Sequence, residues 1–274
     1  MKPGLSRQSP LLRGVNQRLL VVLLLMTGAL SVLWALSTPV PIGMEGRAWG
    51  NYHPDESSHV AVVLFIAEHA ALPPYRIPYD TSVHPPLYHL AAGAIVATMR
   101  PFVGDAGGLR AVRLLTALCG VGTVWLIYRA GRHLMPRQTA LFAATLVALV
   151  PMRASLGGAI NNENLAMLGA TGALATIVGA IVTGTRGSAA RCGKSENGFS
   201  TKRTLLLALW ITVGVGSKLT CLGLFPATFL ALALAARQRG DSRSVWIKQI
   251  LIILGIPALF LGWWFVRNQV LYGD

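Results

Sequence analysis

The chain has 274 residues, of which 53% are hydrophobic and only 12% are charged. Together with a mean hydropathy of +0.55, this composition excludes an ordinary soluble domain and indicates an integral membrane protein. A net charge of +14 would suggest nucleic acid as the partner of a soluble chain. In a membrane protein the charge is instead assigned loop by loop, because cytoplasmic loops collect Lys and Arg.

The three cysteines give no sign of a disulfide framework or of a cysteine metal site. Cys119, Cys192 and Cys221 lie far apart, and two of them fall within or next to apolar segments. Packed or idle thiols are the interpretation that this spacing favours.

Seven apolar stretches predict an all-α protein with about seven transmembrane helices. The first, residues 19–36, follows a basic N-terminal segment and is longer than the apolar region of a usual signal peptide, so we expect it to be retained. The other six are expected at residues 114–128, 139–152, 165–182, 205–215, 222–235 and 247–266.

The distribution of charge supports this topology. With a cytoplasmic N-terminus, the inner side has 16 Lys and Arg residues against Glu196 and Asp241, whereas the outer side has eight basic and eight acidic residues. All of the excess positive charge therefore lies on one face, as the positive-inside rule expects, and no nucleic-acid surface is needed to explain it.

Residues 37–112 form the first extracytoplasmic loop in this topology. The apolar run 60–67 is too short to cross a bilayer. Residues 87–103 are nearly long enough, but a crossing there would place every later basic loop opposite the basic N-terminus. The loop is therefore expected to contribute two juxtamembrane helices at the outer surface.

Two adjacent carboxylates, Asp55 and Glu56, precede the first of these helices. Pro54 suits the first turn of a helix, and acids there favour the helix dipole, so simple capping is one interpretation. The other is catalysis: Asp55 and His59 are spaced to share a helix face, and a half-buried Asp beside a His is a plausible general base. Glu56 points about 100° away, which favours a capping or supporting role for it.

Among cofactors, the residue types suggest only a divalent metal. His53, Asp55 and His59 have a spacing that permits metal binding, although specific zinc motifs are stricter. No metal site is assigned on this spacing.

Further polar groups are expected on the same outer side. His84, Tyr88 and His89 open the second juxtamembrane helix, Glu163 follows two asparagines at the start of a span, and Lys218 lies at a tight outer turn. Arg267 ends the last span. Each has an ordinary interpretation as a cap or a membrane-edge residue, but their convergence on one side indicates a site with a carboxylate base and several cations.

In this order, the motifs resemble the GT-C glycosyltransferases over residues 19–274. More narrowly, they resemble the branch that contains protein O-mannosyltransferases and lipid A aminoarabinose transferases. The motifs are Pro54-Asp55-Glu56, His84-Pro85-Pro86-Leu87-Tyr88, Asn161-Asn162-Glu163-Asn164, Gly216-Ser217-Lys218-Leu219-Thr220, and Gly262 to Asn268 followed by Tyr272-Gly273-Asp274.

The resemblance implies a transferase that uses a polyprenyl-phosphate-linked sugar on the outer face of the plasma membrane, with Asp55 as the catalytic carboxylate. Relatives usually have a Lys before the Pro-Pro pair that contacts the donor phosphate, and here His84 stands instead. Relatives often also have a basic residue after the Asp-Glu pair, where this chain has Ser57 and Ser58. Lys218 or Arg267 are the cations expected to compensate.

The chemistry fits these residue types. Asp55 would remove the proton of an acceptor hydroxyl, and cations would stabilise the leaving phosphate. With one carboxylate and direct attack, inversion at the anomeric carbon is expected. Glu163 would orient the acceptor or the base, and the acceptor itself, a lipid, a protein or a glycan, is left open.

Relatives generally continue for several more spans, so we expect residues 1–274 to be a single GT-C-like domain that is incomplete at its C-terminus. The alternative function is a non-enzymatic transporter, or a protein that binds or assembles with a lipid carrier. Transporters usually show internal repeats and broken mid-membrane helices. The sequence has no evident repeat, which favours the enzyme.

Overall fold

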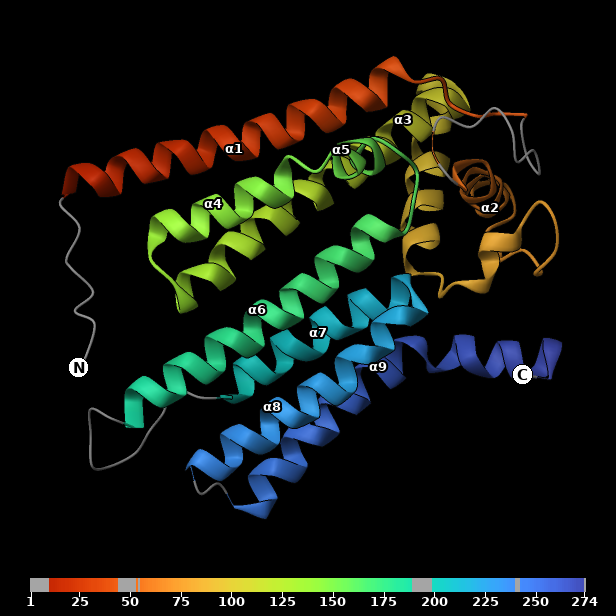
Figure 1. Ribbon diagram of the computed structural model, residues 1–274. Coiled ribbons are helices and arrows are strands. Elements are labelled where there is room, and N and C mark those ends of the chain that lie inside the picture. Colours follow the sequence, from red (N-terminus) through yellow and green to blue (C-terminus); the bar gives the residue numbers. More distant parts are fainter. Residues whose placement is uncertain (1–9, 44–52, 54, 189–198, 240–241, 274) are drawn as a thin grey trace.

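The computed structural model describes residues 10–43, 53, 55–188, 199–239 and 242–273, and within them it contains helices and no strand. The predicted all-α class is therefore confirmed (Figure 1). The elements are α1 Pro10–Ser37, α2 Glu56–His69, η1 Asp80–Val83, α3 Leu87–Leu134, α4 Arg137–Ala148, α5 Pro151–Gly157, α6 Glu163–Ser188, α7 Thr201–Ser217, η2 Leu219–Gly223, α8 Leu224–Arg239 and α9 Arg243–Tyr272.

Five of these helices are long and apolar enough to cross a membrane, or six if α4 and α5, which meet at 68°, form one bent span. The remaining expected span corresponds to α7, whose 17 residues stand at the short end of what crosses a bilayer. The structure supports a multi-pass membrane protein, and the count of seven stays a prediction.

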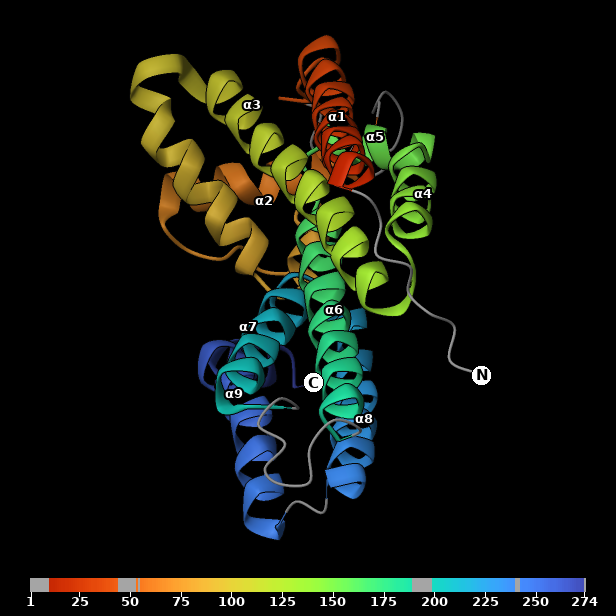
Figure 2. The same cartoon turned by 90° about the vertical axis from the view of Figure 1, so that its left-hand side faces the viewer.

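Helix α3 is two helices joined at a sharp bend. Gly104 has φ 66° and ψ −179°, a backbone conformation outside the helical region, and Pro101 lies just before it. Glycine adopts such a conformation without the steric cost of a side chain. Figure 2 shows the two halves of α3 diverging from this bend. The bend separates residues 87–103 from the expected span at 114–128, as the sequence indicated.

Helices α6, α7, α8 and α9 form a bundle around one apolar core, and both views show them together. Helices α6 and α7 approach closely because glycines line their contact. A Cβ added at Gly169 would lie 2.4 Å from the backbone nitrogen of Gly214, and one at Gly172 would lie 2.3 Å from the Trp210 ring. Small residues of this kind let membrane helices pack backbone against backbone.

Helix α5 packs with similar closeness against the C-terminal end of α1. A Cβ at Gly158 would lie 2.7 Å from Trp34 Cβ and 2.8 Å from the backbone nitrogen of Ala35. At Gly157 it would lie 2.4 Å from Ser31 Oγ. The position of α5 relative to α1 is thus fixed by backbone contact.

Large apolar side chains cover much of the outside of the long helices. Leu25 and Leu33 of α1 and Leu251, Leu259 and Val266 of α9 are each more than 60% exposed. In water such a surface would drive aggregation, so lipid is the solvent that it suits.

Candidate active site

Asp55 lies immediately before α2 rather than within it. Its backbone is in the left-handed region, with φ 59° and ψ 2°, and its side chain is exposed and makes no capping hydrogen bond with the described residues. Asp tolerates this region better than most residues, but at a cost in strain. The carboxylate is thus presented to the surroundings and not used to cap the helix.

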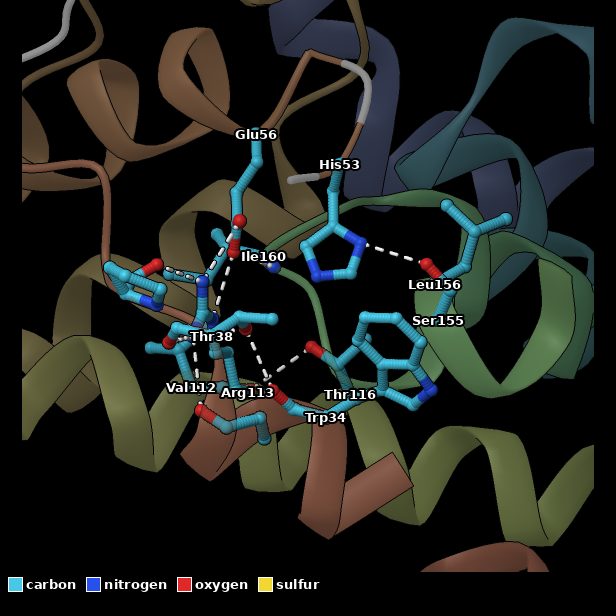
Figure 3. Close-up of polar contacts among 12 residues, drawn as sticks. Trp34, Thr38, His53, Glu56, Val112, Arg113, Thr116, Ser155, Leu156 and Ile160 are labelled. Carbon is cyan, nitrogen blue, oxygen red and sulfur yellow. Dashed lines mark hydrogen bonds and ion pairs between the residues drawn. The ribbon is translucent and has the colours of Figure 1, made fainter. Parts of the chain in front are cut away.

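Glu56 is turned into the protein, opposite to its neighbour. Its two oxygens accept hydrogen bonds from Arg113 Nε and Nη2, each at 2.9 Å, and Oε1 also accepts from the backbone N–H of Ile160 at 2.8 Å. Figure 3 shows this arrangement. Both carboxylate oxygens are occupied, so Glu56 is suited to hold structure rather than to exchange a proton.

Arg113 extends the same network to the end of α1. Its Nη1 donates to the carbonyl oxygens of Ala35 and Thr38 at 3.0 and 2.7 Å and to Thr38 Oγ1 at 3.1 Å, and Nη2 donates to the carbonyl of Pro39 at 2.9 Å. Both Arg113 and Glu56 are almost completely buried. A buried charge pair is tolerable only when its remaining donors and acceptors are satisfied, and here the end of α1 and the backbone of Ile160 satisfy them.

His53, two residues before Asp55, is also fully buried. Its Nδ1 is 3.0 Å from Ser155 Oγ of α5, and its ring meets the edge of Trp34 of α1 with centroids 6.0 Å apart (Figure 3). Burial lowers the pKa of His53, with the charge of Arg113 acting in the same direction and that of Glu56 opposing it. The imidazole is therefore neutral at neutral pH.

His59 and His89 form a buried pair between α2 and the first half of α3. His59 Nδ1 is 2.9 Å from His89 Nε2, and the rings stack with centroids 5.1 Å apart. The predicted pairing of Asp55 with His59 on one helix face is wrong, because Asp55 stands outside the helix and His59 is turned inward to His89. Burial lowers the pKa of His59 well below its usual range, and the neighbouring His89 lowers it further.

The cations expected near the carboxylates fall into two groups. Lys218 and His84 form one, and Arg267 lies apart from them. Lys218, just after α7, forms an ion pair with Glu163 at the start of α6. Burial lowers the pKa of His84, and Lys218 lowers it too, while the carboxylates of Glu163, Asp55 and Asp80 raise it. His84 is therefore within electrostatic reach of all four charges, and Lys218 and Glu163 are bonded to each other. We call Asp55, His84, Glu163 and Lys218 the polar cluster.

Backbone contacts explain how the polar cluster is assembled. Asn161 Oδ1 accepts from the backbone N–H of Glu163 at 2.7 Å and so caps α6. Asn162 Nδ2 donates to the carbonyl of Ser217 at 2.8 Å, which ties the start of α6 to the end of α7. A Cβ at Gly216 would lie 3.2 Å from Leu87 Cβ, so the α7 end also lies against the start of α3, three residues after His84.

Arg267 and Tyr88 lie apart from the polar cluster. Arg267 Nη2 donates to the carbonyls of Leu72 and Pro73, each at 3.3 Å. Tyr88 is only 1% exposed, and its hydroxyl is 3.4 Å from Thr116 Oγ1. Arg267 thus holds the segment after α2, and Tyr88 belongs to the core between α2 and α3.

The residues that the structure describes include no group of three His, Cys, Asp or Glu side chains that could hold a metal ion. In particular, His53 and His59 bond to Ser155 and His89 in separate places. The metal interpretation of His53, Asp55 and His59 receives no support from this geometry.

Sequence reasoning missed Arg113, Ser155 and Ile160 as parts of the site. From the sequence, Arg113 was only one of the eight basic residues counted on the outer side. Its partner Glu56 is 57 residues away. The one available signal was its position at the start of an apolar span, where a charged group needs a partner.

A comparison with protein families identifies the family of the chain. The family model described as dolichyl-phosphate-mannose-protein mannosyltransferase matches residues 83–264. That match covers His84, Glu163, Lys218 and most of the helical bundle. Among curated proteins, no match is found. The chain is a membrane glycosyltransferase of the GT-C superfamily and belongs to the dolichyl-phosphate-mannose-protein mannosyltransferase family.

Proposed function

We propose that this protein transfers a sugar from a polyprenyl-phosphate carrier to an acceptor hydroxyl on the extracytoplasmic face of the plasma membrane. The observation that carries the proposal is the contrast between the two adjacent acids. Glu56 is locked in a buried ion pair, whereas Asp55 is exposed, uncapped and within electrostatic reach of His84. Asp55 is therefore the carboxylate that we assign as the base, since it has no capping bond to the described residues.

The reaction is a single displacement. The Asp55 carboxylate takes the proton of the acceptor hydroxyl, the acceptor oxygen forms a bond to the anomeric carbon, and the bond from that carbon to the phosphate oxygen breaks. The polyprenyl phosphate leaves with the electron pair, so no general acid is required. One attack from the opposite side inverts the configuration at the anomeric carbon.

Lys218 is the cation that we assign to the leaving phosphate. It lies in the polar cluster with Asp55 and is paired with Glu163. A donor phosphate would compete with the Glu163 carboxylate for the ammonium group. Glu163 would then be released to orient the acceptor. The acceptor can be a lipid, a protein or a glycan.

The test is sugar transfer in membranes from a labelled polyprenyl-phosphate donor. We expect Asp55→Asn to lose transfer by at least a hundredfold, which is the usual contribution of a general base. Glu68→Gln is the matched control, because Glu68 is an exposed acid on α2, and it should keep the native rate. Equal transfer by the native chain and Asp55→Asn would reject the base assignment.

The alternative is a transporter or a carrier-binding protein without transferase activity, in which the same cations only hold a phosphate. This alternative predicts that the native chain binds the lipid donor and that no labelled acceptor forms. Donor binding measured beside transfer in the same membranes therefore separates the two functions.

A further inference from the structure

The left-handed turn at Asp55 lies between two bonded side chains, those of His53 and Glu56. On the C-terminal side, Glu56 is fixed by Arg113 and by the backbone of Ile160. On the N-terminal side, His53 is fixed by Ser155 of α5 (Figure 3). The carbonyl of His53 also accepts a long hydrogen bond of 3.5 Å from the backbone N–H of Glu56. Asp55 therefore lies in a turn whose two flanking residues, His53 and Glu56, are both bonded to other elements.

The two helices that contact His53 are packed closely against each other. Helix α5 lies against α1 without room for a side chain at Gly158, where a Cβ would lie 2.8 Å from the carbonyl oxygen of Ser31. Trp34 of α1 contacts the imidazole edge. His53 therefore contacts two helices that are packed closely against each other.

Packing alone does not account for a histidine at this position. The Nε2 atom of His53 is buried and has no hydrogen-bond partner among the described residues. A buried polar atom without a partner costs free energy that an apolar side chain of similar size would avoid. What the imidazole adds is its hydrogen bond to Ser155, so the function of His53 has to be sought in that bond.

We propose that His53 is a positioning residue, whose hydrogen bond to Ser155 holds the backbone at Asp55 in its left-handed conformation and so directs the Asp55 carboxylate toward the other members of the polar cluster. A residue held in a rare backbone conformation near a reacting group is a form of strain that the surrounding structure has to maintain. The catalytic part of this inference rests on the proposed function of Asp55. The conformational part does not.

The conformational part is tested by the melting temperatures of two variants at residue 55. Because only glycine adopts positive φ without a steric cost, Asp55→Gly should melt at a higher temperature than Asp55→Ala. In a His53→Ala background residue 55 is released, and the difference should disappear. If the same difference persists in both backgrounds, His53 does not hold the turn and the proposal is overturned. Should His53→Ala not fold, Ser155→Ala removes the same bond with a smaller change.

The catalytic part is tested by steady-state transfer kinetics. His53→Ala and Ser155→Ala should each lower kcat by about tenfold to a hundredfold with little change in the KM of the donor, as expected for a misplaced base. The double variant should be no worse than either single one, because both remove one bond. His53→Asn, whose amide can still bond Ser155, should recover part of the rate.

His69→Ala, at the exposed end of α2, is the matched control and should keep the native rate. If Asp55→Asn abolishes transfer while His53→Ala and Ser155→Ala transfer at the native rate, the positioning proposal fails alone. If Asp55→Asn transfers normally, the proposed function fails, and the melting temperatures still decide whether His53 holds the turn.

Discussion

The adjacent residues Asp55 and Glu56 have opposite environments. One carboxylate faces outward from a strained turn, and the other is buried against Arg113. The chemical role of each acid follows from its partners. Stability and activity should therefore respond separately to changes at the two positions.

Removing one member of the buried pair should be costly. Glu56→Gln leaves the guanidinium of Arg113 buried without a counter-charge, and such a change costs about 3–5 kcal/mol of unfolding free energy. Unfolding of the purified protein in detergent measures the loss. Arg100→Gln is the control, because its pair with Asp105 is about one-third exposed and should contribute about 0–1 kcal/mol. Equal effects of the two changes would contradict a supporting role for Glu56.

The charge of His84 should make donor binding depend on pH. Burial, assisted by Lys218, lowers the pKa of His84 below its ordinary value of 6.5. At pH 7 the imidazole is therefore mostly neutral, and it gains charge as the pH is lowered. If His84 contacts the donor phosphate, the KM of the donor should fall as the pH is lowered from 7 to 5.

A permanent charge at residue 84 should remove this dependence. We expect His84→Lys to lower the donor KM at pH 7 by about tenfold, the effect of about 1.4 kcal/mol from one added charged contact, and to flatten its pH profile. His69→Lys on the exposed end of α2 should change neither. A pH profile of KM that is the same in His84→Lys and the native protein would exclude this contact.

At the scale of elements, glycines decide how closely the helices pack. The contact between α6 and α7 brings Gly169 against the backbone of Gly214. This contact supports the site, because the start of α6 provides Glu163 and the end of α7 leads into Lys218. A substitution in the middle of the contact between α6 and α7 should therefore alter the polar cluster at the end of these helices.

Gly169→Ala should separate the two helices. The added Cβ would lie 2.4 Å from a backbone nitrogen that cannot rotate away, and overpacking of this kind costs about 1–3 kcal/mol. Thermal unfolding in detergent measures it. Gly255→Ala in α9 is the control, since an added Cβ there meets no described atom within 4 Å, and its melting temperature should stay level or rise. A stable Gly169→Ala variant would mean that α6 and α7 are not held at backbone contact.

The elements were predictable from the sequence to a much greater degree than the contacts between them. Six of the expected spans each fall on one helix, and the span expected at 139–152 falls on the bent pair α4 and α5. The expected end at Val103 falls next to the bend at Gly104, because apolar runs, Gly and Pro are local signals. The bonds of His53 to Ser155 and of Glu56 to Arg113 join residues 102 and 57 positions apart. No periodicity encodes such pairs, so the buried half of the site became visible only in the structure.

At the scale of the whole molecule, the residues of the polar cluster have to lie on one side of the membrane. The charge distribution predicts that the site faces outward and that residues 87–103 do not cross. The second half of α3, from residue 105 to 134, is about 45 Å long at 1.5 Å per residue. It is therefore long enough to carry the chain from the outer to the inner face by itself.

Single cysteines placed in a background without Cys119, Cys192 and Cys221 test this topology. With a membrane-impermeant thiol reagent on intact cells, Glu68→Cys and Ala106→Cys should both be labelled, because these exposed positions flank a segment that stays outside. Gln138→Cys and Lys202→Cys, which are also exposed, should be labelled only after the cells are permeabilised. Labelling of Glu68→Cys and Ala106→Cys from opposite sides would mean that residues 87–103 cross the membrane. Asp55 and Lys218 would then be separated by the bilayer, which would contradict both their shared cluster and the proposed reaction.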